Sequence, residues 1–295
     1  IKHTMRAMGR GPILAIASLP AIAGAQTATA PGGASDPVIV TARPLPPRRD
    51  TLRWFGAISG YPDSDRPLSR LTEPLCIASS GLPATLALPI ADRMLGHAER
   101  LGIRLGGEKC RPNVLILFVD HGPAQIAWLI DHRPGMFGEL PYADVRALAK
   151  DKGPVHAWHM TALTSRDGDP LVAMPGEIPT LHIPSASRIN LPIKSHIAAA
   201  VVMIERDAVT GKTIDQIADY ATMRALAVVR PRQASGVSTI LTLFDGDAAP
   251  GALTAFDWGY LRGLYAGQGN RAPALQYAAM ARFVEDEING GDKTP

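Results

Sequence analysis

The sequence predicts a single α+β domain with a mixed sheet, an N-terminal β-α-β unit and a helical C-terminal part. Two apolar runs of strand length flank a helical stretch between residues 74 and 119, which is the spacing of a parallel β-α-β unit. Two further strand-like runs follow this unit. The C-terminal part carries capping residues in front of amphipathic stretches, which is typical of helices.

The β-α-β unit begins with a strand over residues 74–80, closed by Gly81. Pro89 is a good first-turn residue, so we expect a helix from there to Leu101. The run at 113–119 is continuously apolar, as in a strand whose sheet is covered on both faces. The predicted buried stripe of the helix is Ile90, Met94, Ala98 and Leu101.

The two cysteines, Cys76 and Cys110, lie near the starts of these two strands. Because parallel strands start at the same edge of a sheet, the sulfurs are expected to meet, and in an oxidising compartment an isolated pair favours a disulfide. The alternative is a pair of metal-binding thiolates, which needs further ligands nearby. Neither cysteine belongs to a C-x-x-C pair, and we expect no metal and no cofactor.

Helical stretches are expected near 123–130 and 142–150. A strand over 156–166 then turns at 167–170, and another apolar strand covers 196–204.

Two capping boxes mark the helical C-terminal part. Thr213 with Gln216 begins one helix, and Thr254 with Asp257 begins the next. A last amphipathic helix is predicted over 273–288.

Residues 1–25 are predicted to be upstream residues and a cleavable signal peptide. Arg6 and Arg10 precede an apolar run at 11–22, and the small residues 23–25 suit a cleavage site. The apolar run has about twelve residues, whereas a membrane-spanning helix needs roughly twenty. We therefore expect a periplasmic or secreted protein with no transmembrane segment in the mature chain.

The flexible Pro/Ala-rich leader is predicted over residues 26–66, and the single domain over 67–290. The composition of the leader offers too little apolar surface to offset the entropy of ordering. Trp54, Phe55 and Tyr61 lie at its end. They either form the rim of a ligand site or pack the leader onto the domain, and the second is commoner.

The segment 37–43, Pro-Val-Ile-Val-Thr-Ala-Arg, resembles the TonB box of outer-membrane receptors. This resemblance implies strand addition to an energy-transducing partner, with Val38, Ile39 and Val40 as the partner-binding residues. The alternative is a short β-prone tether.

The charge of the chain argues against nucleic-acid binding. Residues 1–25 hold three of the 30 basic residues and none of the 27 acidic ones, so the rest of the chain has equal numbers of both. A nucleic-acid-binding surface requires an excess of basic residues. The expected partner is an envelope protein or a ligand.

The candidate catalytic residues are Asp120 and His121, which follow the strand at 113–119. Sites gather in loops that follow parallel strands, and a carboxylate near a histidine tunes its pKa. A hydrolase site there would also need one of His156, His159 and His182. His156 and His159 cannot readily share a metal, because residues three apart on a strand point to opposite faces.

Motifs of familiar enzymes are absent from the sequence. It contains no G-x-S-x-G or S-x-x-K nucleophile motif, no phosphate-binding loop and no G-x-G-x-x-G. The leading hypothesis is therefore a non-catalytic binding protein of the envelope. The alternatives are a hydrolase at Asp120 and His121, or transport linked to TonB.

The order of these elements is similar to that of the metzincin peptidases. The stretch L-T-x-x-D-x-x-x-L-x-x-L-Y at 253–265 resembles the segment after their Met-turn. The domain, over about 67–285, also resembles an uncharacterised family of exported proteobacterial proteins, for which the resemblance implies no activity.

The metzincin resemblance implies a zinc-binding H-E-x-x-H motif on the helix after Thr213. That helix contains no histidine, and no histidine follows His196 in the chain; the expected Met-turn at 240–245 also lacks a methionine. The resemblance therefore implies a degenerate domain without the zinc motif. Asp215 and Asp219 share a face of the helix, where acids commonly complement the helix dipole.

Overall fold

The computed structural model describes residues 47–59, 65–171, 181, 187, 189–234, 236–246 and 249–291. Several predicted features lie outside the described residues: the signal peptide within 1–25, the segment 37–43 with Val38, Ile39 and Val40, and His182.

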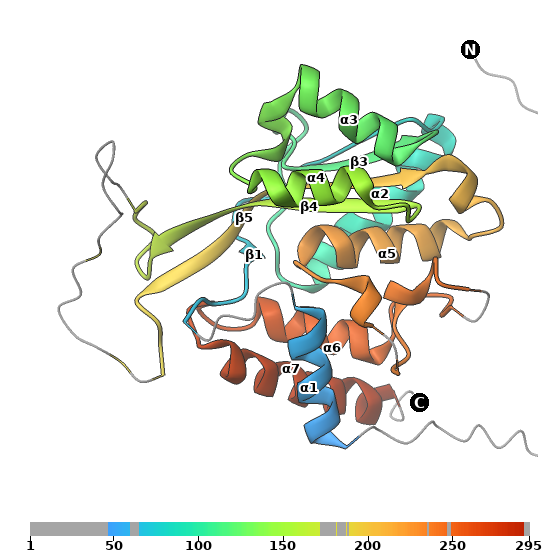
Figure 1. The fold of residues 1–295 in the computed structure, drawn as a ribbon. Helices are drawn as coiled ribbons and strands as arrows, with labels where there is room; N and C mark the ends of the chain where they lie inside the picture. The colour runs from blue at the N-terminus through green and yellow to red at the C-terminus, as the bar shows by residue number, and fades with distance from the viewer. Residues whose placement is uncertain are drawn as a thin grey trace, which may run out of the picture. The chain divides into compact units, whose positions relative to one another are not determined.

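Five strands form one mixed sheet (Figure 1). The parallel strands β2 (Ile77–Ser80), β3 (Val114–Val119) and β5 (Ile193–Glu205) are neighbours in that order. The short strand β1 (Arg70–Leu71) pairs in parallel with the first part of β5. The strand β4 (Val155–Ser165) pairs with β5 in the antiparallel direction along almost its whole length. The predicted mixed sheet and its N-terminal β-α-β unit are confirmed.

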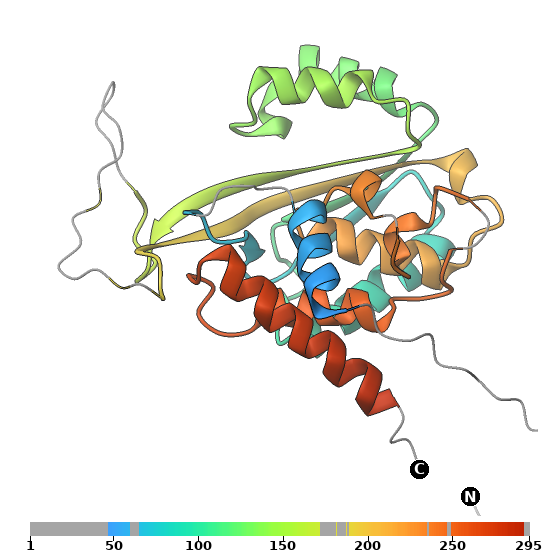
Figure 2. The ribbon, with the colours of Figure 1, turned by 60° about the horizontal axis from the view of Figure 1, so that its bottom comes forward.

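Helices cover both faces of this sheet (Figure 2). On one face, α3 (Gly122–His132) and α4 (Tyr142–Lys150) enclose a small apolar cluster around Trp158. On the other face, α2 (Ala84–Arg100) and α5 (Ile214–Leu226) belong to the larger core.

None of the described helices has the length and apolar composition of a membrane span. The other helices are α1 (Arg48–Ile58), α6 (Ala255–Tyr265), α7 (Pro273–Gly291) and the short 3-10 helices η1 (Pro134–Phe137), η2 (Arg206–Val209), η3 (Pro231–Gln233) and η4 (Ile240–Thr242).

Both predicted capping boxes are confirmed. The hydroxyl of Thr213 accepts from the N–H of Gln216 at 3.1 Å, and that of Thr254 accepts from the N–H of Asp257 at 3.2 Å. The buried carboxylate of Asp257 also accepts from the N–H of Ile240 at 2.9 Å. The second box therefore joins α6 to η4 in addition to starting a helix.

Helix α1 corrects the predicted boundary of the leader, which has to end before Arg48 instead of at residue 66. The aromatic rings of Trp54 and Phe55 lie 4.0 and 4.8 Å from that of Phe256 in α6. The prediction that these two side chains pack onto the domain is confirmed. The helix was missed because its N-terminal half is polar, and its apolar face packs on residues about 200 positions away, such as Phe256.

Helix α2 begins at Ala84, five residues before the predicted start at Pro89. A proline at this place removes the hydrogen bond to the carbonyl of Thr85, in the first turns of the helix. Thr85 is exposed, so water can satisfy that carbonyl. The predicted stripe is confirmed for Ile90, Met94 and Ala98, which are buried.

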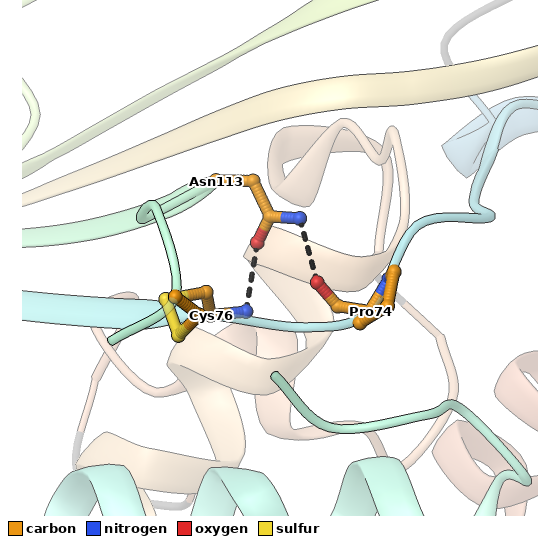
Figure 3. The surroundings of a disulfide bond; sticks show 4 residues. Pro74, Cys76 and Asn113 are labelled. Atoms are coloured by element: carbon orange, nitrogen blue, oxygen red, sulfur yellow. Dashed lines mark hydrogen bonds between the residues drawn. A yellow bond between two sulfur atoms is a disulfide. The ribbon is translucent and has the colours of Figure 1, made fainter. Parts of the chain in front are cut away.

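The predicted disulfide between Cys76 and Cys110 is present, with a Cα–Cα distance of 6.0 Å (Figure 3). The side chain of Asn113 accepts from the N–H of Cys76 at 2.9 Å and donates to the carbonyl of Pro74 at 3.0 Å. Because Asn113 precedes β3 and Cys76 precedes β2, the disulfide and this amide together fix the starts of the two parallel strands.

Candidate functional site

The outer edge of β4 is one of the edges of the sheet. Among the described residues, β4 has β5 as its strand partner and no strand on the other side. The N–H of Glu205 donates to the carbonyl of Pro154 at 2.9 Å, which fixes the alternation of the antiparallel pair. Val155, Ala157 and His159 therefore direct their N–H and C=O groups away from β5.

A groove of about 1350 Å³ follows this edge. Its floor is β4 between Ala157 and Leu163, and its two walls are the region 139–151, which includes α4, and the segment 228–232. Arg66, Pro170 and Leu171 complete the lining. Pockets for small molecules have volumes of roughly 300–1,000 Å³. The groove is therefore large for a metabolite, and β4 contributes residues from Ala157 to Leu163 to its lining.

The wall formed by α4 is held by Trp158. The indole Nε1 of Trp158 donates to the carbonyl of Met136 at 2.8 Å, and its ring packs on that of Phe137 at 5.2 Å. The opposite wall is held by α1, since the N–H of Arg230 donates to the carbonyl of Ile58 at 2.7 Å. Both walls are thus anchored to the core by residues far away in the sequence.

The floor of the groove contains a histidine without a full set of partners. The Nε2 atom of His159 is buried and has no hydrogen-bond partner within the described ranges. Burial and, to a smaller extent, the positive charge of Arg224 lower the pKa of His159 to about 4, against the opposing effect of hydrogen bonds to the main chain of Arg224 and Ala225. The ring is therefore neutral at pH 7.

Arg224 of α5 is a buried cation close to this histidine. Its Nη1 atom donates to the hydroxyl of Tyr220 at 2.8 Å, but its Nε atom has no partner. Among the residues that the structure describes, no carboxylate lies within ion-pair distance of its guanidinium. An uncompensated buried charge is costly, so this part of the core is less well satisfied than the surroundings of Asp219 on the same helix.

Asp120 and His121 lie after β3, as the sequence predicts, but each is engaged in a structural contact. The carboxylate of Asp120 accepts from Nε of Arg206 at 2.9 Å, and Arg206 also donates to the carbonyl of Gly81 at 3.3 Å. The Nδ1 atom of His121 accepts from the N–H of Ala124 at 3.1 Å and so caps α3. These residues join the ends of β2, β3 and β5.

His156 lies beneath the start of α3, on the face of β4 opposite to His159. Its side chain is 1% exposed, and neither ring nitrogen has a hydrogen-bond partner. Burial lowers the pKa of His156, and the charges of Asp151 and Glu205 oppose this shift. No hydrogen bond joins His156 to Asp120 or His121, all of which are described residues.

The helix that would carry zinc in a metzincin, α5, carries a buried ion network instead. Asp219 accepts from Nε of Arg93 at 2.5 Å, shares a hydrogen bond of 2.6 Å with Nε2 of His97, and accepts from the N–H of Leu253 at 2.6 Å. Asp215, one turn earlier, is mostly exposed and pairs with Arg93 at 3.1 Å. These carboxylates hold α2, α5 and the start of α6 together.

Burial alone would raise the pKa of Asp219, but the hydrogen bonds from His97, Arg93 and Leu253 outweigh it and lower the pKa to about 2. In the described part of the chain, no group of three or more histidine, cysteine or acidic side chains has the arrangement of a metal site.

Sequence reasoning missed the groove. The alternating pattern of 156–166 predicted a strand but not that the strand would lie at an edge, because pairing partners are chosen by the tertiary fold. Trp158 was the one available signal, as a large aromatic side chain beside two histidines on a predicted strand.

Comparison with known proteins finds no family model, no curated protein and no solved structure that matches the chain.

Proposed function

We propose that this chain is an exported, non-catalytic binding protein that takes up an extended polypeptide segment along the outer edge of β4. The observation that carries the proposal is the groove of about 1350 Å³ whose floor is an edge strand. Extended peptides bind such edges by adding a strand, with main-chain hydrogen bonds for affinity and side-chain pockets for specificity.

Export is supported by the predicted signal peptide and by the disulfide between Cys76 and Cys110, which suits an oxidising compartment. A degenerate metzincin-like fold is supported by the antiparallel edge strand β4, followed by β5, α5 and the capped helix α6. The lack of histidine on α5 supports binding without hydrolysis.

The hydrolase alternative has weaker support. Asp120 holds Arg206, His121 caps α3, and His156 is enclosed beneath Gly122, where a β-carbon would lie only 2.4 Å from its ring. A catalytic base has to reach the proton that it removes, and none of these side chains opens into the groove along β4.

The test uses Ala157, whose N–H lies in the plane of the sheet and points away from β5. The variant Ala157→Pro removes this donor without removing a hydrogen bond between β4 and β5. The control Ala157→Val keeps the donor and the strand. A library of random linear peptides displayed on phage is selected on the purified protein, and the selected peptides are then measured on both variants by fluorescence anisotropy.

We expect selected peptides to bind the protein and Ala157→Val, and to lose at least about tenfold in affinity on Ala157→Pro, since each main-chain hydrogen bond contributes roughly 1 kcal/mol and its loss leaves a peptide carbonyl unpaired. A second variant, Ala162→Trp, fills the groove and is expected to abolish binding. The proposal is contradicted if Ala157→Pro and Ala162→Trp, both shown to be folded by circular dichroism, bind the selected peptides as tightly as the unmodified protein does.

A further inference from the structure

The two walls of the groove lie on opposite faces of the sheet. The wall formed by α4 belongs to the layer that α4 shares with α3 (Figure 2), whereas the segment 228–232 follows α5 on the other face. A strand added to β4 directs successive side chains to alternate faces. Its odd-numbered side chains therefore meet one wall, and its even-numbered side chains meet the other.

The wall on the side of α4, named here the acidic wall, carries Glu139, Asp144 and Asp151 against the single base Lys150. Glu139 and Asp144 are exposed and make no side-chain ion pair within the described residues. This wall has an excess of negative charge.

The opposite wall, named here the basic wall, carries Arg230 and Arg232 and no acid. Arg224 lies behind it, in the core, with its own Nε unpartnered. The charged side chains that this wall contributes to the lining of the groove are both arginines.

One contact already joins the two walls. Arg232 of the basic wall forms an ion pair with Asp151 of the acidic wall. The side chain of Arg232 is 75% exposed in this pair, and exposed ion pairs contribute little to stability. Charged side chains of a bound peptide can therefore replace the partners in this ion pair with little loss of free energy.

Resting on the proposed function, we infer that the occupant is a segment in which basic and acidic residues alternate, with the basic side chains on the acidic wall and the acidic side chains on the basic wall. Charge complementarity of this kind sets the specificity and the register of the added strand. A segment with the same charges in separate blocks cannot satisfy both walls, because each block presents the same charge to both faces.

The test compares two capped, fluorescein-labelled octapeptides of identical composition. In one, lysine and glutamate alternate; in the other, all lysines precede all glutamates. An octapeptide covers the part of β4 from Ala157 to Leu163 that lines the groove. We expect the alternating peptide to bind about tenfold more tightly at low ionic strength, as two or three exposed ion pairs allow, and this preference to shrink in high salt.

Two double variants test the origin of the preference. Glu139→Lys with Asp144→Lys reverses the acidic wall and is expected to remove most of the preference. Asp92→Lys with Glu99→Lys makes the same change of charge on α2, away from the groove, and is expected to leave the preference intact.

Equal affinities of the two octapeptides overturn the inference, and so does an equal loss of preference in the two double variants. If neither octapeptide binds while library peptides still require the N–H of Ala157, the inference fails and the proposed function stands. If the library peptides also bind Ala157→Pro as tightly as the unmodified protein, both the inference and the proposed function fail.

Discussion

Two buried charged side chains of α5, little more than one turn apart, have opposite surroundings. Asp219 is fully buried and accepts hydrogen bonds from Arg93, His97 and the N–H of Leu253. Arg224 is also buried, but it keeps an unpartnered Nε and has the unpartnered Nε2 of His159 nearby. The described residues supply hydrogen-bond partners for the carboxylate of Asp219, but they leave Nε of Arg224 without one.

The difference indicates that the surroundings of Asp219 serve the stability of the fold, whereas those of Arg224 are left with unsatisfied polar atoms. A buried charge with all its partners holds elements together, whereas each buried polar group without a partner requires a separate explanation, of which a functional site is one. His159 of the incompletely satisfied region lines the groove along β4, whereas Asp219 does not. The binding proposal rests on that groove, and the Asp219 network serves stability.

The largest expected effect is that of Asp219→Ala. Removing the carboxylate leaves Arg93, His97 and a main-chain N–H without their acceptor, so the free energy of unfolding should fall by about 3–5 kcal/mol. Urea denaturation measures this change. The matched control is Asp215→Ala on the same helix, where an exposed carboxylate is lost and the decrease should stay below about 1 kcal/mol. Equal effects of the two substitutions contradict the comparison.

The next effect is a loss of stability in acid. The folded-state pKa of Asp219 is about 2, below its ordinary value of 3.8. Its contribution is therefore complete above about pH 4 and is lost as the pH falls toward 2. The loss should be smaller than that of Asp219→Ala, because a protonated carboxyl still accepts some of the hydrogen bonds. Denaturation between pH 5 and 2 should show a steeper decline in the unmodified protein than in Asp219→Ala, and parallel curves count against this account.

The smallest effect is expected at His156, where polar atoms without partners are replaced. His156→Met keeps an apolar side chain of similar length, so stability at pH 7 should stay within about 1 kcal/mol of its original value or rise. The pKa of His156 is lowered in the folded protein, so the unfolded chain binds its proton first as the pH falls below 6.5. Stability should therefore decline less between pH 6.5 and 5 in His156→Met than in the unmodified protein. A decrease of more than about 2 kcal/mol at pH 7 would show that the ring has partners after all.

Local patterns of the sequence were sufficient for much of the fold. The apolar run at 113–119, the capping residues Thr213 and Thr254, and the positions of the two cysteines all act over a few residues or within one β-α-β unit. Strand and helix periodicity, caps and short connections follow from local steric and hydrogen-bonding preferences. They therefore appear in the structure close to where they were expected.

The candidate site could not be predicted in the same way. Asp120 and His121 were placed correctly at the end of β3, but only the structure assigns them Arg206 and the main chain of α3 as partners. From the sequence, Asp219 was expected only to complement the helix dipole together with Asp215, and the structure shows that Arg93 and His97, more than 120 residues away, surround it.

The sequence by itself determined most of the elements after residue 67, their order and the disulfide, since these depend on short-range periodicity and on two cysteines at neighbouring strand starts. Only the tertiary structure decided that α1 packs on α6, that β4 lies at an edge, and which buried charges find partners. Those outcomes depend on contacts between residues far apart in the sequence. The free energy of these contacts cannot be inferred from a short stretch of the chain.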